Sequence, residues 1–269
     1  MTRPSTWLVT AARVGYGARG VVYVLCGGIA VYVGLVGGDA TGKKGALRAL
    51  LDRPFGSVLL GAIALGFVCY AGWRFVQSLG DADDHGTSLK GLSVRGGLLA
   101  SGVTYSALAL YAGSLLFNAG DRGDGGSVHG TLAGWIGSTP AAFLLCAVFL
   151  GVTIAHGWKA YQRKYRDHLR AGPEVMKVVD PISVAGLLAR GVVVLIVALL
   201  FGYRAVSQAG GAEAGDPGLA GAMRFVRDLP AGGALLIAMG LGLVTFAAYS
   251  LAEAVWRKID VPDALPSPA

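Results

Sequence analysis

The chain has 269 residues, of which 54% are hydrophobic and only 14% are charged, and its formal net charge is +7. A soluble domain carries about 25% charged residues, so this composition excludes an ordinary soluble protein and predicts an integral membrane protein. The basic residues gather at the ends of hydrophobic runs and form no platform with aromatic residues, which excludes a nucleic-acid-binding domain.

Uncharged runs recur along the chain, each long enough to cross a hydrocarbon core of about 30 Å as a helix. They cover residues 20–38, 54–73, 96–120, 130–155 and 229–252. A sixth run, 182–203, is interrupted only by Arg190. Because backbone groups that face lipid must be paired within their own segment, these runs are predicted to be helices. The sequence therefore predicts an all-α membrane protein with six transmembrane helices.

The six helices fall into three similar two-helix repeats within a single membrane domain. Each repeat has a helix that opens on a glycine-rich turn, a polar loop, a short amphipathic segment before a proline, and a second helix. The second helices share a pair of small residues four apart, which allows close helix packing. The repeats cover residues 11–80, 90–167 and 182–258, and their packing glycines are Gly66, Gly151 and Gly242.

A two-helix unit returns the chain to its starting side, so the repeats are predicted to be parallel. We expect a pseudo-threefold bundle with short interfacial amphipathic helices in the outer loops. The densest basic cluster, Arg163-Lys164-Tyr165-Arg166, lies between the fourth and fifth helices, which predicts that this loop and both termini are cytoplasmic. The tail, 259–269, is predicted to be disordered.

The first helix carries the pattern Arg-x-Gly-Tyr-x-Ala-Arg-Gly-x-x-Tyr from Arg13 to Tyr23. The later repeats match this pattern only in part. Over about residues 11–258 the chain resembles the bacterial membrane family called "domain of unknown function 1206". The resemblance implies six helices in three repeats and a place in the bacterial cytoplasmic membrane, and it implies no activity. The third repeat departs most, since Tyr249-Ser250 replaces a tryptophan and a basic residue, and Glu253 replaces a glutamine.

Basic side chains within the predicted helices are the main candidates for a site. Arg19 and Arg190 each lie about 10 Å from the inner boundary, where an unpartnered cation costs several kcal/mol. Glu253 is the only acid that the sequence places within a helix near the membrane's inner edge, so we expect it to pair with Arg190. The other candidate ligand or pairing residues on the inner side are Trp73, Arg74, Gln77, His156, Trp158, Lys159 and Gln162.

Metal, cofactor and catalytic sites are not predicted. His156 has its best candidate partner, His129, on the opposite side of the membrane, on the order of 40 Å away along a helix. A lone hydrogen-bonded histidine is therefore expected. The acidic run from Asp81 to His85 fits a solvated turn, and the sequence has no nucleophile–base set, phosphate loop or zinc motif.

Two functions fit these features. A small permease or channel for an anion or small polar solute would use an inner vestibule lined by Arg19, Arg190, Trp73, Trp158 and Gln162. A structural or lipid-binding protein that stabilises the bilayer or a partner complex would use the same arginines as anchors. The expected partners are membrane lipids, a small anion or lipid headgroup, and a membrane-protein partner or second copy. A water-accessible cavity beside the arginines favours the permease, and a closed seam favours the structural protein.

Overall fold

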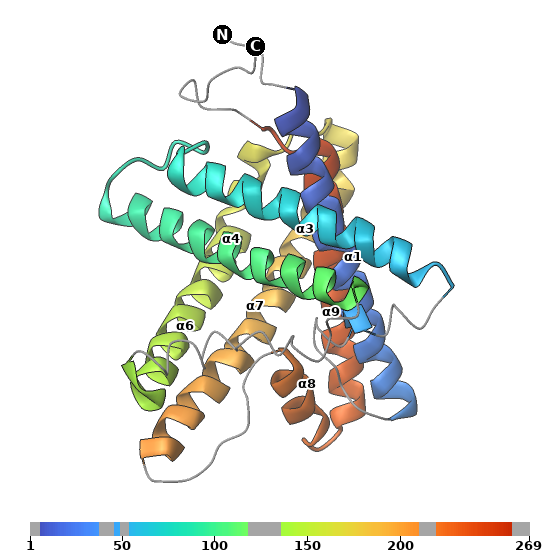
Figure 1. Ribbon diagram of the computed structural model, residues 1–269, viewed down its shortest axis with the longest axis vertical. Coiled ribbons are helices and arrows are strands. Elements are labelled where there is room, and N and C mark those ends of the chain that lie inside the picture. The colour runs from blue at the N-terminus through green and yellow to red at the C-terminus, as the bar shows by residue number, and fades with distance from the viewer. Residues whose placement is uncertain (1–5, 38–45, 49–53, 118–135, 210–218, 260–269) are drawn as a thin grey trace.

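The computed structural model describes residues 6–37, 46–48, 54–117, 136–209 and 219–259. Within these ranges the regular secondary structure is helical apart from one isolated β-bridge, between Leu169 and Arg257, and turns and short loops join the helices. The short elements are the 3-10 helix η2 (Lys164–His168) and the helix α8 (Leu219–Arg227). The long helices are α1 (Thr6–Val36), α3 (Gly56–Leu79), α4 (Leu89–Leu116), α6 (Ser138–Gln162), α7 (Pro173–Ala209) and α9 (Gly232–Trp256) (Figure 1).

All six long helices in the described ranges are long and apolar enough to cross a membrane. Their apolar spans are 24 to 35 residues long. At 1.5 Å per residue even 24 residues rise about 36 Å, which exceeds the hydrocarbon core. Large apolar side chains such as Leu35, Leu65 and Ile154 are exposed on their outer faces, where lipid is the compatible solvent. The chain is therefore a multi-pass membrane protein, as the composition predicts.

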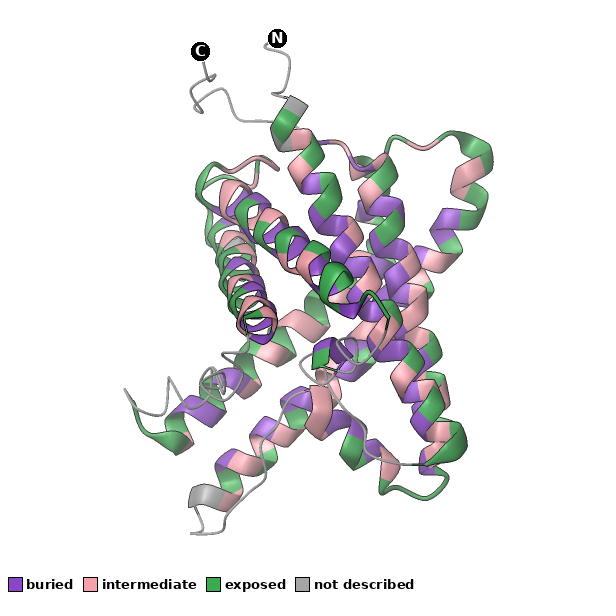
Figure 2. Ribbon diagram, turned by 45° about the vertical axis from the view of Figure 1, so that its right-hand side comes forward, coloured by how far each residue is buried: buried purple, intermediate pink, exposed green. Residues whose placement is uncertain are grey.

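The antiparallel helices α1 and α9 pack along each other (Figures 1 and 2). A Cβ atom on Gly27 would lie 2.6 Å from the carbonyl oxygen of Gly240, and one on Gly34 would lie 2.6 Å from that of Gly233. Such close approach of two backbones requires glycine on both sides. On either side of this pair, α3 packs on α1 and α7 packs on α9.

The first and third repeats pack their two helices in the same way. In each, a glycine of the first helix faces the backbone of an aromatic residue in the second helix. The packing glycine of the second helix faces an alanine in return. The pairs are Gly15 with Tyr70 and Gly66 with Ala18 in the first repeat, and Gly186 with Phe246 and Gly242 with Ala189 in the third.

The second repeat is arranged differently. Its helix α4 packs on α3 and its helix α6 packs on α7, and α4 with α6 is not among the extensively packed pairs of described helices. Gly151, the packing glycine of α6, has open space where a Cβ would lie. Only 17% of the α6 span is buried, against 39–44% of the other spans. The structure thus does not show the pseudo-threefold arrangement of the repeats that the sequence predicts.

The short helix α8 is amphipathic, as expected for the outer segment of the third repeat. It buries Ala222, Met223 and Val226 and exposes Arg224. In the first repeat, residues 46–48 of the corresponding segment are helical. Most of the second repeat's segment, and the tail from residue 260 onward, lie outside the described residues.

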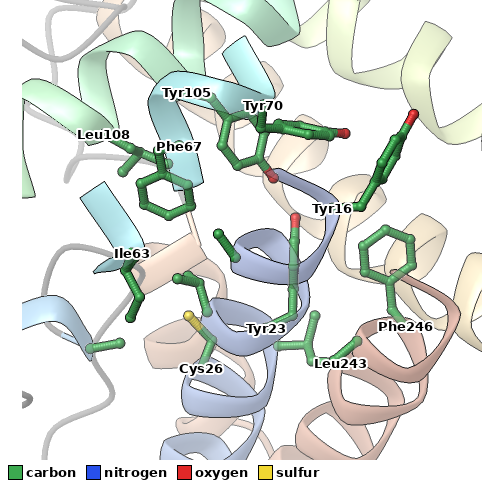
Figure 3. Close-up of a cluster of buried hydrophobic side chains, with 14 of the residues drawn as sticks. Tyr16, Tyr23, Cys26, Ile63, Phe67, Tyr70, Tyr105, Leu108, Leu243 and Phe246 are labelled. Atoms are coloured by element: carbon green, nitrogen blue, oxygen red, sulfur yellow. The ribbon is translucent and has the colours of Figure 1, made fainter. Parts of the chain in front are cut away.

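Aromatic side chains from α1, α3, α4 and α9 fill the core (Figure 3). The ring centroid of Tyr70 lies 5.3 Å from the ring centroid of Tyr16 and 4.6 Å from that of Tyr105. The ring centroids of Tyr23 and Phe246 are 4.8 Å apart. All three contacts are edge-to-face, a favourable geometry for aromatic pairs. Because buried tyrosine hydroxyls need hydrogen-bond partners, this core also provides polar groups to the charged cluster beside it.

Candidate functional site

A cluster of buried charged side chains joins α1, α3 and α9, with Arg19 of α1 at its centre. Each nitrogen of the guanidinium group has a partner. Nε donates to Ser250 Oγ at 3.1 Å, Nη1 to the Tyr70 hydroxyl at 2.5 Å, and Nη2 to Glu253 Oε2 at 2.5 Å. Arg19 is only 3% exposed and Glu253 only 2%. These three partners therefore compensate the free-energy cost of placing a cation at this depth.

Glu253 connects Arg19 to the end of α9 and to the loop after α3. Its second oxygen, Oε1, accepts a hydrogen bond from Arg257 Nη1 at 2.6 Å. Nη2 of Arg257 lies 3.4 and 3.3 Å from the two carboxylate oxygens of Asp83. Asp83 also accepts from Gln77 Nε2 at 2.6 Å. Cations and carboxylates thus alternate from Arg19 to Asp83, which ties three elements distant in sequence to one another.

Two further side chains of α3 extend the cluster. Nη1 of Arg74 donates to Gln77 Oε1 at 3.0 Å, and its Nη2 donates to the Tyr70 hydroxyl. Trp73 is buried, and its Nε1 donates to the Tyr16 hydroxyl at 3.2 Å. The structure therefore brings all three α3 candidates, Trp73, Arg74 and Gln77, into the surroundings of Arg19.

Cations outnumber carboxylates around this cluster. Nζ of Lys159 in α6 lies 5.4 Å from the centroid of the Tyr249 ring, and the guanidinium carbon of Arg190 in α7 lies 4.6 Å from that of Phe246. Among the described residues neither cation has a hydrogen bond or an ion pair, and each contacts an aromatic ring. The expected pair between Arg190 and Glu253 does not form, because the glutamate is occupied by arginines of α1 and of the segment after α9.

Two of the remaining predicted residues of α6 face outward, and the third lies beside α7. Trp158 is 53% exposed and Gln162 is also exposed, so neither lines an inner vestibule. His156 is half-buried, and its Nδ1 lies 2.7 Å from the carbonyl oxygen of Val152 one turn earlier. The backbone hydrogen bond agrees with the sequence analysis, and His129, the candidate partner considered there, lies outside the described residues.

The divergence of the third repeat has a structural explanation. Ser250 and Glu253 stand where the second repeat has Lys159 and Gln162, and both bond Arg19 of the first repeat. If the third repeat also carried a basic residue at this point, it would repel Arg19. Glu253 and the small hydroxyl residue Ser250 replace that repulsion with attraction. The substitutions in the third repeat are therefore complementary to Arg19.

Sequence reasoning missed a second polar cluster, around Asp180 in α7. Its carboxylate accepts hydrogen bonds from Arg163 at 2.8 Å, from Arg166 at 2.6 and 2.7 Å, and from the Tyr165 hydroxyl at 2.5 Å. The hydrogen bond to Asp180 raises the pKa of Arg166, and burial together with the same carboxylate raises the pKa of Tyr165. In the sequence, an acid that follows a dense basic run at short distance could have predicted this cluster. The hydrogen bonds to Asp180 hold η2 against α7.

The acidic turn after α3 serves two purposes. Asp81 accepts hydrogen bonds from the backbone N–H groups of His85 at 2.8 Å and Gly86 at 2.7 Å. Burial opposes ionisation of Asp81, but these two bonds and the charge of Arg95 outweigh it and lower its pKa. Asp83, by contrast, turns inward to the buried cluster. The expectation of a wholly solvated turn is therefore wrong for Asp83.

Two cavities lie near the helix ends on the side of the molecule that holds this cluster. One has a volume of about 200 Å³ and is lined mainly by residues at the start of α1 and after α9. The other has a volume of about 260 Å³ and lies beside Asp180 and Lys177. Neither is lined by Arg19 or Glu253. The side chains of Arg19 and Glu253 are only 4% and 3% exposed, so the protein encloses the central ion pair.

The fold and the buried cluster define a multi-pass helical membrane protein with an internally paired ionic centre. The sequence profile of a family described as Domain of Unknown Function (DUF1206) matches residues 14–81 and 185–257, which together make up just over half of the chain. The chain therefore belongs to the DUF1206 family. The two matched segments are the first and third repeats, whose helix crossings are equivalent.

A bacterial protein is similar over almost the whole chain. The chain is 28% identical over 267 residues to "Uncharacterized protein YxxB" of Bacillus subtilis (strain 168), and the match covers 95% of this chain and 93% of that protein. No solved structure matches the chain. Helices α4 and α6 lie outside the two segments matched by the family profile, but they fall within the length that the bacterial protein shares.

Proposed function

We propose that this protein is a structural, lipid-binding membrane protein that stabilises the bilayer or a partner complex and has no catalytic activity. The observation that carries the proposal is the closed state of the buried cluster. Arg19 is fully partnered within the protein, and neither described cavity reaches it. A transport site must exchange its ligand with water, whereas an internally satisfied ion pair holds helices together.

The energetics support the same function. A solute that took the place of Glu253 at Arg19 would first have to break a buried ion pair, and breaking such a pair costs about 3–5 kcal/mol. The seam between α1 and α9 offers no alternative route, because Gly27 and Gly240 bring the two backbones into contact. The central helix pair therefore behaves as a packed scaffold.

We also propose that the three repeats are parallel, arranged around a pseudo-threefold axis, and that both termini are cytoplasmic. The equivalent helix crossings of the first and third repeats support the repeat relationship. The basic segment around η2 lies beside the end of α9, since Lys258 N–H donates to the His168 carbonyl at 2.8 Å. Clustered basic residues favour the cytoplasmic side.

A permease for an anion or small polar solute is the second candidate. The excess of cations favours it, because Lys159 and Arg190 contact aromatic rings and no carboxylate among the described residues. A desolvated cation without a counter-ion attracts anions. This hypothesis requires a route for water to Arg190 from both sides of the membrane.

Reconstituted vesicles separate the two functions. We expect the efflux of chloride and of phosphate from vesicles containing the protein to equal that from protein-free vesicles. We also expect phospholipid to stay bound when the protein is released from nanodiscs in a native mass spectrometer. Protein-dependent anion efflux that Arg190→Gln abolishes would overturn the proposal in favour of the permease. A wild type that releases every lipid would remove the lipid-binding part.

A further inference from the structure

The smaller cavity lies outside the buried cluster, between the start of α1, the segment before α7 and the chain after α9. Its volume is about 200 Å³, below the range of about 300–1,000 Å³ typical of pockets for drug-sized ligands, so it suits a small group. Among the described residues, no acidic side chain lines it. Its basic lining residues are Arg13, Arg170, Arg257 and Lys258.

The backbone holds these basic residues in place. The N–H group of Arg170 donates to the Trp256 carbonyl at 2.7 Å, and that of Lys258 donates to the His168 carbonyl at 2.8 Å. The β-bridge between Leu169 and Arg257 lies between these two bonds. Two segments that are distant in sequence thus form a short ladder, and it presents their cations to one cavity. Preorganised cations lose little entropy when they bind an anion.

Arg257 links this cavity to the buried cluster. Its terminal nitrogens bond Glu253 and Asp83, which are also bonded by Arg19 and Gln77. Arg257 is 7% exposed, and its Nε is buried without a hydrogen-bond acceptor in the described part of the chain. The two carboxylates behind Arg257 are therefore already shared among several donors, and the acceptor of Lys258 Nζ is the neutral carbonyl of Asp167, at 2.9 Å.

We infer that this cavity binds a phosphate group, supplied either by the headgroup of an anionic phospholipid or by free phosphate. Guanidinium groups match phosphate oxygens in geometry, and basic pockets at the cytoplasmic ends of membrane helices bind phosphorylated headgroups. Val9, Val255 and Trp256 provide an apolar wall at the helix ends, where the glycerol and upper acyl chain of a lipid would lie. The phospholipid source rests on the lipid-binding function proposed above, whereas the phosphate chemistry does not.

The test uses the full chain in nanodiscs of neutral phosphatidylcholine, with and without phosphatidylglycerol, and separately with inorganic phosphate. The variants are Lys258→Gln and the double variant Arg13→Gln/Lys258→Gln. Lys177→Gln is the matched control, because it removes the same charge from a side chain 69% exposed outside this cavity. The readouts are the retained lipid in native mass spectra and the melting temperature, with the melting temperature in neutral lipid as the check on folding.

We expect the wild type and Lys177→Gln to retain phosphatidylglycerol, and the double variant to bind it at least about tenfold more weakly. Retention by all variants alike would overturn the assignment of this cavity while leaving the proposed lipid binding intact. Stabilisation of the wild type by inorganic phosphate without lipid retention, lost in the double variant, would support the phosphate site and reject its lipid source. If Lys177→Gln lost phosphatidylglycerol binding as strongly as the double variant, the binding would depend on general surface charge. That result would overturn the assignment of a phosphate site to this cavity.

Discussion

The carboxylate of Glu253 holds the buried cluster together, and Glu253→Gln removes its charge with little change in volume. In the wild type the carboxylate accepts from Arg19 at 2.5 Å and from Arg257 at 2.6 Å. The variant leaves Arg19 without any carboxylate partner. Arg257 keeps only its longer contacts with Asp83, of 3.3 and 3.4 Å. We therefore expect the variant to be strongly destabilised.

The magnitude follows from the burial of the pair. Removing one partner of a buried ion pair costs about 3–5 kcal/mol, because an uncompensated charge remains in a region of low dielectric. An exposed pair contributes only about 0–1 kcal/mol. Since 1 kcal/mol shifts the melting temperature of a domain of about 150–250 residues by about 2–4 °C, the expected decrease is about 6–20 °C.

Thermal unfolding in nanodiscs, followed by tryptophan fluorescence, measures this decrease, with Trp73 as a buried reporter beside the cluster. The control is Glu174→Gln, whose carboxylate pairs with Lys177 at 2.8 Å while the two side chains are 83% and 69% exposed. Its melting temperature should fall by less than about 4 °C. Equal decreases in the two variants, or none in Glu253→Gln, would refute the conclusion that buried ion pairing stabilises this protein.

Two further predictions concern the central seam and the segment before α7. Gly27→Ala should destabilise the protein by about 1–3 kcal/mol, because its Cβ would lie 2.6 Å from a backbone oxygen of Gly240. The neighbouring Gly28→Ala, which meets no atom within 4 Å, should be neutral or stabilising by up to about 1 kcal/mol. Melting temperatures that shift equally in the two variants would contradict the tight seam. Burial and the charge of Arg257 lower the pKa of His168 below its ordinary 6.5, so the unfolded state binds the proton more readily. The contribution of His168 to the free energy of unfolding should therefore be constant above about pH 6.5 and should decrease as the pH falls below that value. A His168→Gln variant should show a weaker decrease, and an unchanged pH profile of the melting temperature would exclude His168 as its cause.

The sequence alone determines that this is a helical membrane protein, because each hydrophobic run must by itself be long enough to cross the bilayer. The length of a run and its freedom from charge are local properties, so the spans could be predicted without knowing how they pack. The small residues Gly66 and Gly242 could likewise be assigned to helix crossings, because close backbone approach requires glycine or alanine. Gly151 carries the same local signal and yet faces open space.

Only the tertiary structure decides which charges meet. Glu253 could pair with Arg190 or with Arg19 on the evidence of depth alone, since both arginines lie equally far inside their helices. The packing of α9 along α1 through Gly27 and Gly240 brings Arg19 to the glutamate, although the two are 234 residues apart in sequence. The same packing places Arg257 between the buried carboxylates and the basic cavity. Ion pairs form between surfaces that the helix contacts bring together, and those contacts depend on the shapes of both helices at once.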